Sequence, residues 1–174
     1  HPSLLPEFRG SSPIQATIIA GSDPAVSIIK MDEKMDHGPV LTQFKEEVLE
    51  NDTNETLRTR LFEKSAEVLI EMIPAYIEGK IKLKPQDESK ATYTKIITKQ
   101  DGFIDLAKDD PIIIERKLRA YMPWPGIWTQ LRLGSAGQAK RLKILEFKNE
   151  PITVQLEGKK PTSWKIFRRS FLFS

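Results

Sequence analysis

A stretch of ten residues decides how the rest of the sequence is interpreted: His1-Pro2-Ser3-Leu4-Leu5-Pro6-Glu7-Phe8-Arg9-Gly10. Proline fixes φ and has no backbone N–H, so neither a helix nor a central strand is expected to pass through these residues. The stretch therefore predicts a stiff, extended loop with an imidazole at its head. Such a loop suits a chemical group that must be held in place, although a proline-rich connector next to an ordinary histidine would have the same composition.

The residues after this loop predict a short helix followed by two strands. Ser12 and Pro13 fit the N-cap and the first helical position, and Gly21 fits the C-terminal stop. The β-branched residues within 25–31 predict a buried strand, and residues 40–44 predict a second strand. We expect the two strands to be neighbours, joined by a polar turn.

A long amphipathic helix is predicted next. Asn51-Asp52-Thr53-Asn54 is expected to cap its start, where Asp52 and Glu55 have the spacing of a capping box, and Gly79 fits its end. Pro74 falls inside the helical pattern and predicts a kink or a break there. Apolar side chains recur at helical spacing, which predicts one continuous face buried in the core. This face consists of Leu57, Leu61, Phe62, Leu69, Ile70, Ile73 and Ile77.

The second half of the chain has a different pattern. Residues 80–90 are polar and have the composition of a linker between domains. Asp109-Asp110-Pro111 begins a helix with acidic residues in its first turn and basic residues later, as the helix dipole favours. Short alternating runs then predict a small antiparallel sheet or barrel. These runs cover 128–133, 141–145 and 152–156, with a glycine turn at 134–137.

Composition and charge limit the classes of function. The chain has no cysteine, which excludes disulfides and thiolate zinc sites and fits a reducing compartment, and no run approaches the ~20 apolar residues of a membrane-spanning helix. Residues 111–174 contain 13 Lys and Arg against 4 Asp and Glu, a net charge of +9 in a chain of net charge +3. Such a half either binds a polyanion or presents a solvated basic face. The candidate residues are Lys140, Arg141, Lys143, Lys159, Lys160, Lys165, Arg168 and Arg169.

Few residues could carry chemistry. His1 and His37 are the only histidines, and their spacing matches no metal-binding motif. The sequence has neither a Walker phosphate loop nor a Gly-x-Ser-x-Gly nucleophile elbow. Asp36, in the turn between the two predicted strands, could pair with His1 for acid–base work or oxyanion stabilisation. Spacing alone leaves this pair one candidate among many, because the chain has 24 Asp and Glu residues.

Two motifs together resemble a known family. The loop His1-Pro2-Ser3-Leu4-Leu5-Pro6-x-Phe8-Arg9-Gly10 is similar to the signature loop of the folate-dependent formyltransferases. In that family a helix, a strand and a loop ending in Asp-x-Gly-Pro or Asp-x-Gly-Asp follow, and this chain has Asp36-His37-Gly38-Pro39 in that place. The resemblance implies catalytic roles for His1 and Asp36. It also implies that Ser3, Leu4, Leu5 and Pro6 line the site of the formyl donor, 10-formyltetrahydrofolate, without a metal.

Later segments resemble one branch of that family, the methionyl-tRNA formyltransferases. The similar segments are Pro85 to Ile96, Asp101-Gly102-x-Ile104-Asp105, Arg119 to Gly126, and Val154 to Phe167. The resemblance implies an α/β fold: the C-terminal part of a Rossmann-like catalytic domain (1–83), an interdomain linker (84–104) and an OB-like β-barrel that binds tRNA (105–174). It further implies a cytoplasmic, monomeric enzyme of translation initiation that formylates methionyl initiator tRNA, with no membrane partner.

The family pattern also includes features that these 174 residues do not contain. The family's catalytic group has an asparagine two residues before the histidine, and early strands of its sheet precede the signature loop. We therefore expect the sequence to lack the N-terminal part of the enzyme, and the activity to belong to a longer parent protein. Two alternatives remain: a non-catalytic RNA-binding fragment, or a sister formyltransferase or hydrolase that uses the same folate.

Overall fold

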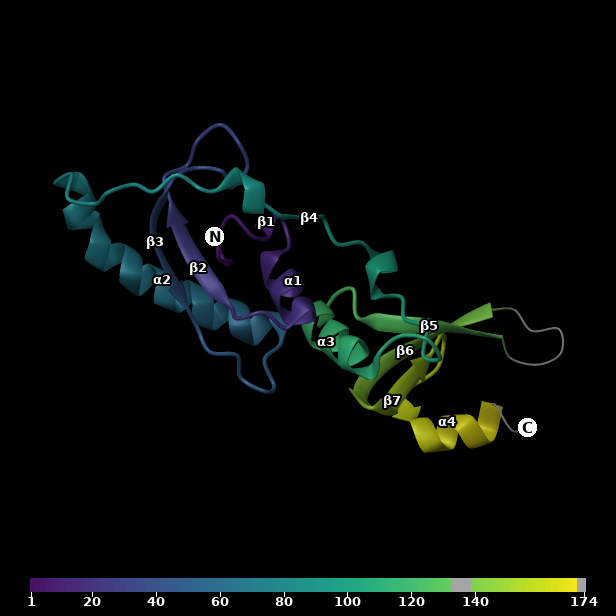
Figure 1. Ribbon diagram of the computed structural model, residues 1–174. Coiled ribbons are helices and arrows are strands. Elements are labelled where there is room, and N and C mark those ends of the chain that lie inside the picture. The colour runs from purple at the N-terminus through teal and green to yellow at the C-terminus, as the bar shows by residue number, and fades with distance from the viewer. Residues whose placement is uncertain (133–138, 172–174) are drawn as a thin grey trace. The chain divides into compact units, whose positions relative to one another are not determined.

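The chain forms two compact units, His1–Ile96 and Ile97–Ser174 (Figure 1). The structure is a computed structural model that describes residues 1–132 and 139–171. Within this part of the chain, no helix has both the length and the apolar content needed to cross a membrane.

The first unit is a small α/β arrangement around one antiparallel strand pair. After β1 (Arg9–Gly10) and α1 (Pro13–Ala20), β2 (Ala25–Ile29) pairs with β3 (Val40–Lys45). The long helix α2 (Asn54–Ile77) packs against β2 and α1. The two predicted strands are therefore confirmed as neighbours, and the turn between them carries Asp36 as predicted.

The predicted ends of α1 are confirmed. Ser12 is the N-cap residue, Pro13 occupies the first helical turn, and Gly21 is the C-cap with φ of 68°. A left-handed φ is easy for glycine because it has no Cβ, so Gly21 ends the helix and directs the chain into β2.

The start of α2 differs from the prediction. Thr53 and Thr56 form the capping box, instead of Asp52 and Glu55. The side chain of Asp52 is buried and instead pairs with Arg60, two turns along the helix, at 2.6 Å. The break expected at Pro74 is also wrong, because the helix runs unbroken to Ile77. Pro74 lacks the N–H that would bond to the carbonyl oxygen of Ile70, yet the helix continues for three residues beyond it.

The apolar face predicted for α2 is buried only near its start. Leu57 and Leu61 are each 1 % exposed, whereas Ile70 is 72 % and Ile77 is 77 % exposed. The elements that pack on α2 are short: α1 has 8 residues and β2 has 5, against 24 in α2. At 1.5 Å per helical residue, α1 spans only a third of the length of α2. The prediction of one continuous buried face is therefore wrong beyond Leu61. The other exposed members are Phe62, Leu69 and Ile73.

A segment between the two long helices returns to the first loop. It contains a turn of 3₁₀ helix, η1 (Glu88–Lys90), followed by β4 (Tyr93–Thr94), which pairs in parallel with β1. Val40, at the start of β3, forms an isolated bridge with Lys84. The polar residues predicted as a linker are thus bonded to the first unit at both Lys84 and β4.

The second unit is rich in sheet. Its elements are η2 (Lys99–Gly102), α3 (Pro111–Tyr121), β5 (Ile127–Arg132), β6 (Ala139–Lys148), β7 (Glu150–Leu156), β8 (Thr162–Ser163) and α4 (Trp164–Phe171). The strands form one antiparallel sheet in the order β5-β6-β7-β8, with α3 packed on β5 and β6 and α4 on β7. The three predicted runs are confirmed as strands within the described residues, which end at 132 in the first run, and α4 and β8 were not predicted.

The sheet of the second unit is open in the part of the chain that the structure describes. The order β5-β6-β7-β8 contains no pairing between its first and last strands, so the expected barrel is not confirmed. The predicted glycine turn at 134–137 lies outside the described residues. Buried aliphatic and aromatic side chains from the helices, the strands and the segment after η2 form the core. They include Ile104, Ile114, Ile127, Leu142, Ile144, Val154 and Phe167.

Candidate active site

His1 and Asp36, predicted as a pair, lie close together in the first unit. The backbone N and O of His1 each bond to the backbone of Ser27 in β2 at 2.8 Å, which fixes the start of the loop. The Nδ1 atom of His1 lies 3.5 Å from Oδ1 of Asp36, and Nε2 lies 3.1 Å from the carbonyl oxygen of Phe8. Because a carbonyl can only accept, Nε2 carries a proton in this contact. Nδ1 is therefore the ring atom that can exchange a proton on the Asp36 side.

Asp36 is held in a left-handed backbone conformation, with φ of 51°. Its Oδ2 atom accepts a 2.7 Å hydrogen bond from the backbone N–H of Gly10, which leaves Oδ1 to face His1. Aspartate tolerates this conformation better than most residues do. Gly38, two residues after Asp36, is required sterically, because a Cβ atom at this position would lie 1.9 Å from the carbonyl oxygen of Lys30. The Asp-x-Gly spacing thus lets the turn close tightly beside Asp36.

A buried hydroxyl fixes the proline-rich loop against β2. Ser27 is fully buried; its Oγ accepts hydrogen bonds from the backbone N–H of Leu5 at 3.0 Å and from Nε2 of Gln43 at 2.8 Å. The same hydroxyl donates to the carbonyl oxygen of Ser3 at 2.7 Å. Sequence reasoning missed Ser27 and Gln43. The available signal was a polar residue within the apolar run Val26-Ser27-Ile28, which demands a buried partner.

An open cavity of about 860 Å³ borders the His1–Asp36 pair. His1, Pro2 and Asp36 line it, together with residues of β2, residues 31–35 and side chains of α2. The predicted folate-binding residues Ser3, Leu4, Leu5 and Pro6 are not among the lining residues. Ser3 and Leu5 have buried side chains, whereas Leu4 and Pro6 are half-buried. Only the last two could offer a side chain to a ligand.

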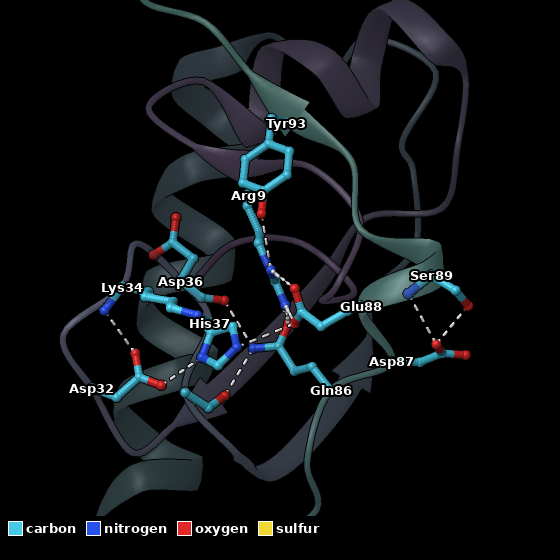
Figure 2. Close-up of polar contacts among 11 residues, drawn as sticks. Arg9, Asp32, Lys34, Asp36, His37, Gln86, Asp87, Glu88, Ser89 and Tyr93 are labelled. Carbon is cyan, nitrogen blue, oxygen red and sulfur yellow. Dashed lines mark hydrogen bonds and ion pairs between the residues drawn. The ribbon is translucent and has the colours of Figure 1, made fainter.

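The fully buried Arg9 is the centre of a second cluster missed by sequence reasoning (Figure 2). Its guanidinium group is bonded to Gln86, Glu88 and Tyr93, all from the segment predicted as a linker. In the sequence, Arg9 looked like the polar end of the loop. A strongly polar residue such as arginine can be buried only if its donors are paired, and these partners lie more than 75 residues away.

Two carboxylates that flank His37 have pKa values below their usual range. The hydrogen bond from His37, 2.6 Å from Oδ2, holds the pKa of Asp32 below its usual range. The hydrogen bonds from Arg9 likewise hold the pKa of Glu88 below its usual range. His37 lies between these two carboxylates, with Nε2 3.4 Å from Oε1 of Glu88. The imidazole of His37 therefore pairs with Asp32 and Glu88. Among residues 1–132 and 139–171, no group of three or more His, Cys, Asp or Glu side chains could hold a metal ion.

Two family models match the sequence. The model described as formyl transferase matches residues 1–73, and the model described as formyl transferase, C-terminal domain, matches residues 96–153. The chain belongs to the formyltransferase family. The first match covers the whole of the His1–Asp36 site, and the second covers α3 and much of the sheet.

Curated relatives support the same family. Methionyl-tRNA formyltransferase from Chloroflexus aggregans is 43 % identical over 145 residues, which are 80 % of this chain and 47 % of that protein. The methionyl-tRNA formyltransferase of a Roseiflexus species is 43 % identical over 133 residues, 76 % of this chain and 41 % of that protein. The chain therefore spans somewhat less than half the length of these relatives.

Solved structures agree on the fold. A 4-N formyltransferase from Francisella tularensis has a TM-score of 0.67 and 25 % identity, and the match covers 85 % of this chain and 61 % of that chain. Methionyl-tRNA formyltransferase from Clostridium thermocellum has a TM-score of 0.62 and 20 % identity, with 94 % and 67 % covered. The α/β formyltransferase fold with a sheet-rich C-terminal part is thus the fold of this chain.

Proposed function

We propose that this chain provides the His1–Asp36 part of the active site of a methionyl-tRNA formyltransferase. The enzyme would transfer the formyl group of 10-formyltetrahydrofolate to the α-amino group of methionine on initiator tRNA. The observation that carries the proposal is the histidine–carboxylate pair, 3.5 Å apart at a cavity of about 860 Å³. The 43 % identity to enzymes of that name selects this member of the family.

The pair suits the chemistry of formyl transfer. The amine nitrogen attacks the formyl carbon, the C–N bond to the folate breaks, and negative charge develops on the formyl oxygen in between. A protonated imidazole at His1 would stabilise that oxygen, since His1 borders the cavity. Asp36 would hold the imidazole in place and help to move the proton of the attacking amine to the departing folate nitrogen.

The folate would lie against the proline-rich loop. Since the side chains of Ser3 and Leu5 are buried, we assign the contacts to Leu4, Pro6 and the loop backbone. The backbone N–H of Leu5 donates to Ser27 and its carbonyl oxygen accepts from Gln43, and these bonds keep that backbone in place. A loop whose shape is fixed before binding loses little conformational freedom when the ligand arrives. No metal is needed for this chemistry, and the enzyme would act as a monomer in the cytoplasm.

The basic second half would bind the tRNA backbone. The proposed chain is divided into a catalytic part (1–83), an interdomain linker (84–104) and an OB-like domain (105–174). The predicted cations lie on β6, after β7 and on α4, and all but the half-buried Arg141 are exposed. If phosphate contacts dominate, RNA affinity should fall steeply with salt concentration. A binding measurement on the chain between 50 and 200 mM salt tests this, and a flat response would contradict the phosphate-binding role.

The decisive experiment restores the length of the relatives. The chain is fused behind the N-terminal half of the Chloroflexus aggregans relative and assayed for formylation of charged initiator tRNA. His1→Ala and Asp36→Ala should each lower turnover by about 10²-fold or more. Asp23→Ala is the matched control, because Asp23 is an exposed carboxylate paired only with Lys45 among the described contacts. Near-normal turnover of the His1 or Asp36 variant would refute its catalytic role.

The same assay separates the alternatives. Product with a sugar-nucleotide amine but not with tRNA would favour the sister branch, of which the 4-N formyltransferase is a structural neighbour. RNA binding by the unfused chain, together with an inactive fusion, would favour the non-catalytic fragment. Formylated methionyl-tRNA made by the fusion supports the proposal.

A further inference from the structure

Arg9 binds the segment 84–94 to the signature loop through five side-chain hydrogen bonds. Its Nε and Nη2 atoms donate to Oε1 of Gln86 at 3.2 and 2.8 Å. Its Nη1 and Nη2 atoms donate to the carboxylate of Glu88 at 3.0 and 2.6 Å, and Nη1 also donates to the hydroxyl of Tyr93 at 3.1 Å. The guanidinium group is thus fully paired within the protein. We call Arg9, Gln86, Glu88 and Tyr93 the Arg9 cluster.

The contacts of Gln86 fix the orientation of its amide. Arg9 can only donate, so the atom facing it must be the amide oxygen. The amide nitrogen then faces two carbonyl oxygens, those of Asp36 and Gly38, each at 2.8 Å. Both faces of one side chain are therefore satisfied in a single orientation, without the usual ambiguity between amide oxygen and nitrogen. Gln86 thus links the buried Arg9 to the backbone of the turn that carries Asp36.

Asp36 is consequently held from two sides. Its carbonyl oxygen accepts from Gln86, and its Oδ2 atom accepts from the N–H of Gly10, the residue after Arg9. These two bonds act on a residue with φ of 51°, a conformation that a free aspartate rarely adopts. They leave Oδ1 as the carboxylate atom that faces Nδ1 of His1.

We propose that Gln86 is a positioning residue for Asp36, and that Arg9 and Glu88 hold Gln86 in the orientation this requires. The proposal rests on the proposed function, because it assigns Asp36 a role in formyl transfer. It makes the segment 84–94 a working part of the site, although it lies about 50 residues from Asp36 in sequence. Gln86 is not among the residues that line the cavity beside His1 and Asp36, so it would act on the site through its bonds to the turn that carries Asp36.

The test uses Gln86→Glu, which keeps an oxygen for Arg9 but replaces the donor that faces Asp36 and Gly38 with an acceptor. Gln86→Met is a second variant that removes both halves without adding charge. Asp87→Asn is the matched control: Asp87 is exposed, its carboxylate bonds to Ser89 and Lys90, and asparagine keeps the capping role at η1. In the fusion enzyme, both Gln86 variants should lower kcat by about 10- to 100-fold with little change in KM, and Asp87→Asn should change neither.

A measurement on the 174-residue chain gives a readout independent of activity. The N–H of Gly10 bonds to Oδ2 of Asp36, whereas the N–H of Arg9 bonds to the carbonyl oxygen of Thr92 at 2.9 Å. In Gln86→Glu, amide exchange at Gly10 should accelerate about tenfold while exchange at Arg9 stays slow. Equal acceleration at both amides would show general loosening and would overturn the positioning role.

The two proposals fail in different ways. If Asp36→Ala retains turnover, the proposed function of Asp36 fails, whatever Gln86 does. If Asp36→Ala abolishes turnover while Gln86→Glu and Gln86→Met keep normal kcat, only the positioning role is overturned. A rise in KM at constant kcat in the Gln86 variants would also overturn it, because misplacement of Asp36 should affect the chemical step.

Discussion

The Arg9 cluster and the C-terminal two-thirds of α2 differ in where their partners lie. Arg9 is a charged residue that is 1 % exposed, because Gln86, Glu88 and Tyr93 satisfy its donors. Ile70 is an apolar residue that is 72 % exposed, on a helix face whose spacing predicted burial. Residue type alone would give the opposite assignment in both cases. Burial follows from which other segments of the chain reach the position.

The comparison separates two kinds of sequence signal. A motif such as Asp36-His37-Gly38-Pro39 specifies contacts within a few residues, so its geometry can be inferred locally. A periodic apolar face specifies only that something should cover it, and that cover must come from elsewhere. In this chain α1 and β2 cover the first two turns of α2 and are too short to cover the rest. The same contrast should appear in the free energy of unfolding of variants at the two kinds of position.

The largest contrast should lie within α2 itself. Leu61→Ala removes a fully buried side chain and should lower the free energy of unfolding by about 2–5 kcal/mol. Ile70→Ala should change it by less than about 0.5 kcal/mol, because the side chain is exposed and alanine has the higher helix propensity. Urea unfolding followed by far-UV circular dichroism measures both.

Tryptophan fluorescence provides an internal control for this experiment. All three tryptophans, Trp124, Trp128 and Trp164, belong to the second unit, so their emission does not report on α2 directly.

If Ile70→Ala costs as much free energy of unfolding as Leu61→Ala, the exposed face must be covered in solution. Repeating the measurement at several protein concentrations would then show whether a second copy provides the cover.

A smaller contrast is expected between two glycines. Gly38→Ala would place a Cβ atom 1.9 Å from the carbonyl oxygen of Lys30, so the turn must shift, at a cost of about 1–3 kcal/mol. Gly79→Ala meets no atom within 4 Å and is strained only by its φ of 71°. The expected cost at Gly79 is about 1 kcal/mol. In the fusion enzyme, Gly38→Ala should also lower turnover, because the turn carries Asp36, and Gly79→Ala should not.

The sequence could predict most local elements, because these depend on nearby residues, and it could predict the His1–Asp36 pair only because two motifs resemble those of a known family. Ser12 and Gly21 bound α1 as expected, and the turn carrying Asp36 lies beside the first loop. The partners of Arg9 could not be predicted, since Gln86 and Glu88 lie in a polar segment whose composition is that of a linker. The role of Asp52 was also mistaken, because a capping residue and a buried ion-pair partner have the same local spacing.

The Asp52–Arg60 pair extends the comparison to pH. The hydrogen bonds from Arg60 are the main cause that holds the pKa of Asp52 below its usual range, despite burial. A depressed pKa in the folded state means that the pair stabilises the protein above the unfolded pKa of about 3.9 and loses this effect as pH falls through the folded value. Asp52→Asn should therefore cost about 1–2 kcal/mol at pH 7, and progressively less below pH 4. Urea midpoints of the two proteins, measured from pH 7 to pH 3, should converge. A constant difference would show that Asp52 acts through its bonds to Leu49 and Thr56, which asparagine can partly keep, and that its charge contributes little.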